Sequence, residues 1–495
     1  MTYPARGAFA VCLVVTLMAG HAARMHAQSP AELDARIARV ETGLRFPVVI
    51  RGKPPIRMRL DQRMRDLKVP GLSVAVIDSF RIAWARGYGV REVGGTDSVT
   101  TETLFQAASI SKPVAALAAL RLVQQGRLDL DEDVNRRLTS WKVPENRFTT
   151  TQPVTLRRLL SHSAGLTVHG FRGYAATEQV PTIRQVLDSQ PPSNSAPIRA
   201  DTFPGARWRY SGGGYTVMQQ LLVDVVGRPF PELMHSLVLG PLGMAHSTYE
   251  QPLPQHLSGR AASGHRSAGR VVAGKWHTYP EMAAAGLWTT PSDLARYAIH
   301  VSLAAGGRSS DVLSQATATR MLTVQSGTYG LGPSLGGQGR NASFSHGGAN
   351  EGFRAFFIAF PERGQGAAIM TNSDAGGTLA LEILRAIAEE YDWPAQRPVE
   401  KTVAAVSSET PARIAGRYAL ETAPNIFIVI TADSGRVLAE VTGQFKTEIY
   451  PESATRYFSV DRDVEFTFGP TEGGKVASVV VRVGSGGTFK AKRVD

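Results

Sequence analysis

A serine and a lysine three residues apart form the most reactive pair in the sequence. Ser109 and Lys112 lie in the second half of the nearly apolar stretch 105–112. An Ala- and Leu-rich segment follows and predicts a helix over Lys112–Gln125. At the start of a helix, such a pair shares one face, and the positive end of the helix dipole favours a serine alkoxide and a neutral amine. The pair predicts a nucleophile with lysine as its base. Taken alone, Ser-x-x-Lys is equally typical of a helix cap beside a solvent-facing lysine.

Two further segments carry groups suited to the same chemistry. Tyr210 lies in the loop Phe203–Gly212, where a phenol held between cations can serve as general acid or base. The other segment is the run Ser345-His346-Gly347-Gly348-Ala349. Its two glycines allow a substrate backbone to approach closely, and its N–H groups could complete an oxyanion hole. Considered alone, the first is a packing tyrosine and the second a glycine-rich turn.

The elements around these motifs predict an α+β fold. Strand-like runs at 72–77 and 81–89 indicate one β-hairpin, and runs at 353–360 and 366–371 indicate a second. Helices are expected at residues 30–44, 60–67, 112–125, 155–160, 214–226, 292–301 and 379–391. Strands at both ends with helices between them favour one antiparallel sheet flanked by helices, with a helical insertion.

The N-terminus has the pattern of a secretory signal peptide. Arg6 precedes the apolar run Ala8–Ala19, and small residues follow up to a cleavage site after Ala27. This pattern predicts a secreted or periplasmic protein without a stable membrane span after cleavage, although an N-terminal anchor is the alternative. The only cysteine, Cys12, lies in the apolar run, so the mature chain would have no disulfide and no thiol chemistry.

The chain after residue 27 divides into three predicted parts. Residues 28–395 contain the motifs and would form the catalytic domain. Residues 396–411 are rich in Pro, Ala, Ser, Thr and Glu and indicate a linker. Residues 412–495 alternate in short strands separated by glycines, which predicts a small all-β domain, either a sandwich or a barrel.

Composition and missing motifs exclude several function classes. The net charge is +12, but the Lys and Arg residues are scattered, which favours a solvated basic surface and not a nucleic-acid site. The sequence has no His-Glu-x-x-His run, phosphate loop or dinucleotide fingerprint, so we expect neither a metal nor a cofactor. The expected partner is a small-molecule or peptide ester or amide, and the oligomeric state is left open.

Together, in this order, the motifs resemble the serine β-lactamase-like superfamily of class C β-lactamases, D-alanyl-D-alanine carboxypeptidases and related esterases. The segments 154–166 and 329–332 also resemble stretches of that family, and the resemblance runs from about Leu60 to Tyr391. Residues 414–418 are similar to the opening strand of the lipocalin-like domains appended to many such hydrolases. The resemblance implies a β-lactamase/transpeptidase-like fold and an acyl-enzyme mechanism.

The same resemblance assigns expected roles. Ser109 would be acylated, and Lys112 and Tyr210 would relay its proton. The backbone amides of Ser109 and Ala349 would hold the oxyanion. His346 would line the site where many relatives carry lysine, contacting a substrate carboxylate or the tyrosine phenol.

Two other residues qualify this assignment. We expect His162 to have a structural role. We count Gly212 among the expected substrate-binding residues. It stands where the family usually has the asparagine that contacts the ligand's acylamide. Its presence favours an esterase or amidase over an enzyme that acts on β-lactams or peptides.

Two alternative readings remain open. The first is a non-catalytic, penicillin-binding-like ligand-binding protein on the same fold, although the presence of the whole serine, lysine and tyrosine set argues against it. The second places the nucleophile at Ser334, because residues 332–336 fit the pattern G-x-S-x-G of α/β-hydrolases. That pattern needs a strand before it and a helix after it, and here a glycine-rich loop follows.

Overall fold

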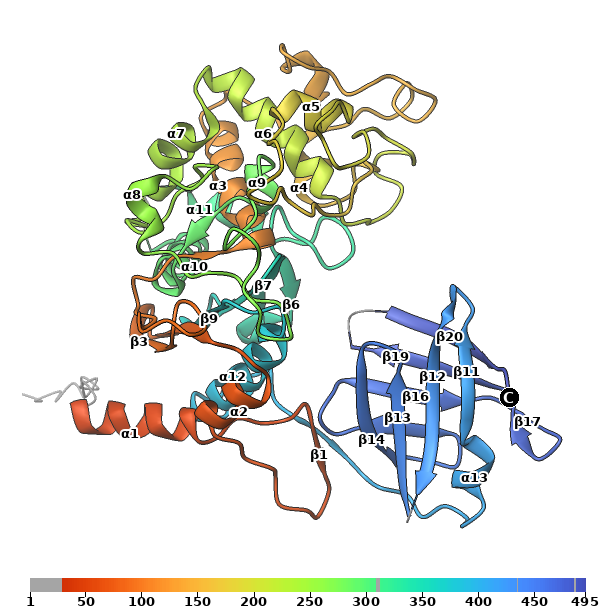
Figure 1. Ribbon diagram of the computed structural model, residues 1–495. Helices are drawn as coiled ribbons and strands as arrows, with labels where there is room; N and C mark the ends of the chain where they lie inside the picture. The colour runs from red at the N-terminus through yellow and green to blue at the C-terminus, as the bar shows by residue number, and fades with distance from the viewer. Residues whose placement is uncertain (1–28, 309–311, 434, 485–486) are drawn as a thin grey trace, which may run out of the picture.

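The computed structural model describes residues 29–308, 312–433, 435–484 and 487–495 (Figure 1). The predicted signal peptide, including Cys12, lies outside the described residues. Within these ranges, no helix combines the length and the apolar character needed to cross a membrane.

A six-stranded antiparallel sheet forms the centre of the first domain, in the order β3-β2-β9-β8-β7-β6. Its strands are β2 (Gly71–Asp78), β3 (Arg81–Gly89), β6 (Ser334–Gly336), β7 (Ser343–Asn350), β8 (Phe353–Phe360) and β9 (Gln365–Thr371). Leu72 of the early hairpin pairs with Thr371 of the late one. This pairing confirms the prediction that both ends of the domain build one sheet around a helical insertion.

Alternating side chains of the sheet divide the hydrophobic core into two layers. In β2, Val74 and Val76 pack with α1 (Pro30–Glu41) and α12 (Gly376–Glu390) on one face. Ala75 and Ile77 point to the other face, into the core that holds α3 (Ser111–Gln124) and α10 (Pro291–Ala305). This two-residue period is that of a strand covered on both sides. The sheet is therefore a rigid central layer between two sets of helices.

The predicted helices are present with small shifts at their ends. They are α1, α2 (Leu60–Asp66), α3 (Ser111–Gln124), α4 (Leu156–Leu160), α6 (Gly212–Val226), α10 (Pro291–Ala305) and α12. The side chains of Thr155 and Thr290 cap α4 and α10, and Gly227 ends α6 with φ 73°. Shorter helices that the sequence did not indicate are α5 (Ile183–Asp188), α7 (Phe230–Met234), α8 (Gln255–Ser258), α9 (Met282–Ala285) and α11 (Gln315–Met321).

The C-terminal region is a closed eight-stranded barrel, which decides between the two predicted all-β architectures. Its strands are β11 (Gly416–Leu420), β12 (Ala423–Asp433), β13 (Arg436–Val441), β14 (Phe445–Pro451), β15 (Arg456–Ser459), β16 (Val464–Phe468), β19 (Ser478–Val483) and β20 (Gly487–Arg493). Closure comes from the pairing of β11 with β20. Buried side chains such as Tyr418, Ile428 and Phe466 fill its interior.

The segment between the domains contains regular structure. Residues 396–411 include β10 (Val399–Lys401) and the first residues of α13 (Thr410–Ile414). Strand β10 pairs in parallel with β1 (Val48–Ile50), near the start of the described chain. The Lys401 ammonium also lies 3.2 Å from Glu452 and 2.5 Å from Glu465 of the barrel. The connecting segment therefore contacts the first domain through strand pairing and the barrel through ion pairs.

Candidate active site

The serine and lysine of the first motif are in direct contact. Ser109 lies on a short 3₁₀ turn, η1 (Ala108–Ile110), and Lys112 lies in the first turn of α3. The lysine Nζ donates to Ser109 Oγ over 3.0 Å and to the Ala284 carbonyl over 2.8 Å. The serine therefore precedes the helix instead of belonging to it, but the predicted juxtaposition of the two side chains is present.

The turn that carries the serine is held in an unusual conformation. Ala108 has φ 49°, a left-handed value that is costly for a residue with a side chain. Ser111 Oγ donates to the Ala108 carbonyl over 2.5 Å and accepts the Leu287 N–H over 2.9 Å. The Tyr249 hydroxyl donates to the Ser111 carbonyl over 2.7 Å. These buried hydrogen bonds fix the backbone on which Ser109 stands.

Burial makes Lys112 a usable base. Its side chain is 2% exposed, and its hydrogen bonds go to the Ser109 hydroxyl and the Ala284 carbonyl, not to a carboxylate. Desolvation of the ammonium lowers the pKa of Lys112 to about 7. A large fraction of the amine is consequently neutral at physiological pH, and it can accept the proton of the neighbouring hydroxyl.

Tyr210 completes the group around the serine oxygen. Lys112 Nζ lies 5.0 Å from the centre of its ring, and the nearby Ser109 hydroxyl favours the ionised form of its phenol. Burial raises the pKa of Tyr210, so the resting phenol is protonated. The tyrosine is therefore placed to pass a proton between groups, and it does not start the reaction as a phenolate.

The His162 ring packs against the ring of Tyr210. The two rings stack with centroids 4.2 Å apart and an interplanar angle of 29°. His162 Nδ1 accepts the Ser211 N–H over 3.1 Å. Burial, together with the charge of Lys112, holds the pKa of His162 well below its usual value, so the ring is neutral. This geometry gives His162 a positioning role.

The run from Ser345 to Ala349 forms part of strand β7. Viewed as a lone motif it suggested a glycine-rich turn, but β7 pairs with β8 along residues 344–350. Strand β6 covers only residues 343–345, so within the described chain no strand covers the outer edge of β7 beyond Ser345. The absence of a side chain at Gly348 allows this edge to approach the turn of Ser109 closely. A Cβ at Gly348 would lie 2.2 Å from the Ala107 carbonyl oxygen. The open edge and the turn are thereby brought together where the oxyanion hole is expected.

His346 does not supply the positive charge of the lysine that many relatives carry. Burial and the neighbouring Lys112 lower the pKa of His346 to about 3, so the imidazole is neutral. Its Nδ1 lies 2.7 Å from the Gly347 carbonyl, while its buried Nε2 has no hydrogen-bond partner in the described structure. A neutral ring with a free nitrogen can accept or donate one hydrogen bond, but it does not attract a carboxylate by charge.

Ser109, Tyr210 and His346 face a cavity of 1070 Å³ that extends from the first domain to the barrel. On the first domain it is lined by Ser109, His169, Tyr210, Tyr329, His346, Gly347, Gly348 and Ala349. On the barrel it is lined by Gln444, Phe445, Asp461, Arg462, Asp463, Val464, Val483 and Gly484. The second domain therefore supplies part of the wall, and an extended substrate would touch both domains.

The structure places Gly212 outside the lining of this cavity. Its N–H donates to the His169 carbonyl over 3.0 Å. A Cβ at Gly212 would lie 3.0 Å from the Phe171 ring and 3.1 Å from that carbonyl, so a larger residue has no room without rearrangement. His169 and Tyr329 line the cavity instead. Sequence reasoning missed both roles, although Tyr329 begins a family-like segment and His169 follows another closely.

Ser334 lies in a different environment from a hydrolase nucleophile. It begins the short edge strand β6 and pairs with Ser345. The residues that follow form only the 3₁₀ turn η4 (Gly339–Asn341), so the arrangement of strand, sharp turn and helix is missing from this described segment. Ser334 is also not among the residues that line the cavity of Ser109.

Comparison with known proteins agrees with the geometry. Residues 56–392 match the family described as Beta-lactamase. Penicillin-binding protein 4* of Bacillus subtilis (strain 168) is 23% identical over 425 residues, which cover 78% of this chain and 88% of that protein. Esterase EstB of Burkholderia gladioli is 28% identical over 270 residues, which cover 52% and 68%. The octameric penicillin-binding protein homologue from Pyrococcus abyssi has the same fold, with a TM-score of 0.60 and 22% identity over 88% of this chain and 98% of that one.

Proposed function

The chain is a serine hydrolase of the β-lactamase family, and we propose that it cleaves carboxylic esters through an acyl-enzyme on Ser109. The observation that carries this proposal is the contact of 3.0 Å between Ser109 Oγ and the buried amine of Lys112. A base whose pKa is about 7 is well matched to general-base catalysis at neutral pH. This pairing activates a hydroxyl that would otherwise be a poor nucleophile.

The proposed reaction has two half-reactions. Ser109 Oγ attacks the ester carbonyl carbon while its proton passes to Lys112, directly or through the Tyr210 phenol. The backbone amides of Ser109 and Ala349 stabilise the oxyanion, and the proton is returned to the departing alkoxide. A water molecule then attacks the acyl-enzyme with the same groups as base and acid, releasing the carboxylic acid and restoring the serine hydroxyl.

Two features favour esters over β-lactams and peptides. His346 is neutral at physiological pH, so it offers no cation to a substrate carboxylate. Gly212 has no side-chain amide for an acylamide group, and a side chain at this position would require the Phe171 ring and the His169 carbonyl to shift. Esterase EstB, a relative at 28% identity, carries the same activity in its name.

The pattern of residues 1–27 further supports a secreted or periplasmic enzyme.

A substrate panel combined with active-site labelling tests the proposal. We expect the full chain to hydrolyse short-chain p-nitrophenyl esters faster than nitrocefin or D-alanyl peptides, and a fluorophosphonate probe to modify Ser109. Mass spectrometry of the labelled peptide identifies the nucleophile. Absence of both turnover and adduct would favour the non-catalytic ligand-binding alternative, and an adduct on Ser334 would favour the α/β-hydrolase alternative.

The pH dependence of the reaction reports the ionisation of Lys112. We expect kcat/KM for the ester to rise with pH, to reach half of its maximum near pH 7 and to level off above about pH 8, because the lysine acts only after losing its proton. Initial rates followed at the isosbestic wavelength of p-nitrophenol give this profile. The variant His346→Gln should keep the same midpoint, since the pKa of His346 is about 3. A profile without an inflection near neutrality would contradict the assignment of the base.

A further inference from the structure

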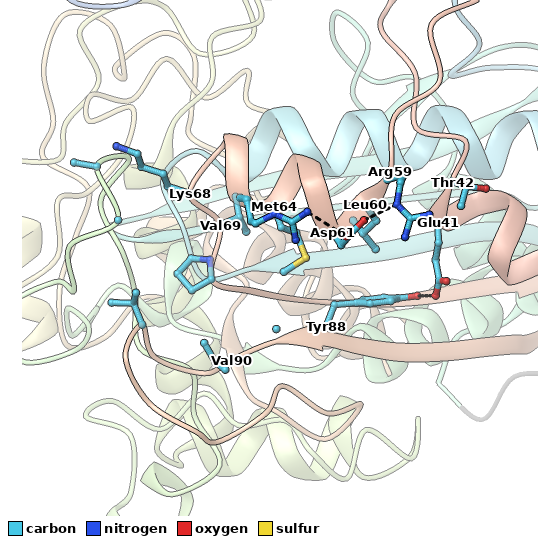
Figure 2. Close-up of a pocket in the computed structure, with 16 residues that line it drawn as sticks. Glu41, Thr42, Arg59, Leu60, Asp61, Met64, Lys68, Val69, Tyr88 and Val90 are labelled. Carbon is cyan, nitrogen blue, oxygen red and sulfur yellow. Dashed lines mark hydrogen bonds and ion pairs between the residues drawn. The ribbon is translucent and has the colours of Figure 1, made fainter.

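A second cavity, of 740 Å³, lies on the outside of the first domain and shares no lining residue with the cavity of Ser109 (Figure 2). It is formed by the end of α1, by α2, by the end of β3 and by residues 268 and 269. Its volume falls in the range of about 300–1,000 Å³ that is typical of small-molecule sites. Neither the catalytic groups nor the barrel take part in it.

The floor of this groove is largely apolar. Apolar side chains along it include Leu60, Met64, Val69 and Val90, and the ring of Tyr88 lies among them (Figure 2). The Tyr88 hydroxyl is already engaged, because it donates to Glu41 over 2.9 Å. A peptide backbone would need hydrogen-bond partners along its length, and such a floor does not supply them. The surface fits a hydrocarbon chain better.

The charges around the groove leave one cation unpaired. Glu41 is bound by Tyr88 and by Arg86, and Asp61 forms ion pairs with Arg59 at 3.1 Å and Arg65 at 3.2 Å. Among the charged side chains described along the groove, the exposed Lys68 alone forms no ion pair. Figure 2 shows Lys68 at one end of the groove, with Glu41 and Arg59 at the opposite end.

The backbone at Lys68 closes the end of α2, where the Val69 N–H donates to the Met64 carbonyl over 2.9 Å. Lys68 follows α2 with φ 52°, in the left-handed region where glycine is the inexpensive residue. This conformation belongs to the helix ending, and it sets Lys68 beside the apolar groove. A cation at the end of α2 could also interact with the helix dipole, and the experiment below separates that structural role from binding.

We propose that this groove binds a medium-chain fatty acid, with the hydrocarbon chain on the apolar floor and the carboxylate paired with Lys68. An apolar channel that ends at a single unpaired ammonium matches a ligand with one chain and one anionic head group. The inference does not depend on the hydrolytic activity, because the groove and the Ser109 cavity are separate.

Isothermal titration of the full chain with decanoate, below its micellar concentration, tests the site. We expect one equivalent to bind, with octanoate about tenfold weaker because two fewer methylenes are buried. The neutral 1-decanol should bind at least tenfold more weakly than decanoate. Absence of decanoate binding, or equal binding of the alcohol, would overturn the proposal.

Variants at Lys68 locate the carboxylate. Lys68→Gly should weaken decanoate binding at least tenfold, while the thermal midpoint stays constant or rises because glycine tolerates the positive φ. Lys68→Gln keeps the side-chain stem and answers the same question if the glycine variant is unstable. Lys275→Gly is the matched control, since Lys275 also has positive φ (75°) but pairs with Glu92 and does not line the groove. Wild-type affinity in both Lys68 variants would place the ligand elsewhere and refute the site.

Discussion

Replacing Ser109 with alanine is expected to reduce kcat/KM for a short-chain p-nitrophenyl ester by roughly 10⁴-fold or more. The variant keeps the cavity, the expected oxyanion donors and the buried lysine, but it has no oxygen to acylate. Steady-state kinetics of purified wild type and variant measure the effect. Activity that survives this substitution would show that another residue forms the acyl-enzyme.

The variant Ser334→Ala serves as the matched control. Ser334 belongs to an edge strand and does not line the cavity of Ser109. We expect its kcat/KM to equal that of the wild type within a factor of about two. Circular dichroism and the thermal midpoint of both variants establish that any loss at Ser109 is not a loss of fold.

The second large effect is expected from Lys112→Met, which exchanges a buried amine for an apolar side chain of similar length. Removal of the base should lower kcat/KM by about 10²–10⁴-fold. The same substitution should raise stability near neutral pH, because a fully buried amine at 2% exposure is costly to hold without a carboxylate. Activity and stability therefore change in opposite directions, which is typical of a catalytic residue and not of a structural one.

The stability difference should depend on pH in a defined way. Because the pKa of Lys112 is lowered from 10.5 to about 7, the unfolded chain binds more protons than the folded chain between these values. The free energy of unfolding of the wild type therefore rises with pH across this window, and that contribution is missing in Lys112→Met. Urea denaturation at several pH values compares the two proteins. A constant difference between pH 7 and 10 would mean that the lysine has an ordinary pKa.

Local patterns were sufficient to predict the framework and much of the site. The two hairpins were evident from apolar runs between turn residues, and the helices expected at residues 155–160 and 292–301 are present as α4 and α10. The spacing of Ser109 and Lys112 gave their contact because the turn and helix that hold them are continuous in the chain. The resemblance to the β-lactamase family, based on three motifs in order, is confirmed by the family match over residues 56–392.

Features that depend on distant parts of the chain were not accessible in the same way. The glycines at 347 and 348 read locally as a turn, and only their pairing with β8 makes that segment a strand. The place of Gly212 depends on Phe171 and the His169 carbonyl, which occupy the space of its missing side chain. The barrel residues of the cavity, such as Phe445 and Arg462, come from a separate domain more than 300 residues after Ser109. No local sequence pattern indicates that these barrel residues line the cavity of Ser109.

The parallel pairing of β1 with β10 has a consequence for the order in which the molecule assembles. It joins Val48 to Val399, and so it encloses the whole sheet and all of its covering helices except α1 in one loop of the chain. Closing so long a loop in an unfolded chain has an entropic cost, and the hydrogen bonds of three residue pairs offset only a small part of it. Once the enclosed sheet has formed, its compact structure already holds the two ends near each other. Folding of the catalytic domain should therefore precede the formation of this ladder.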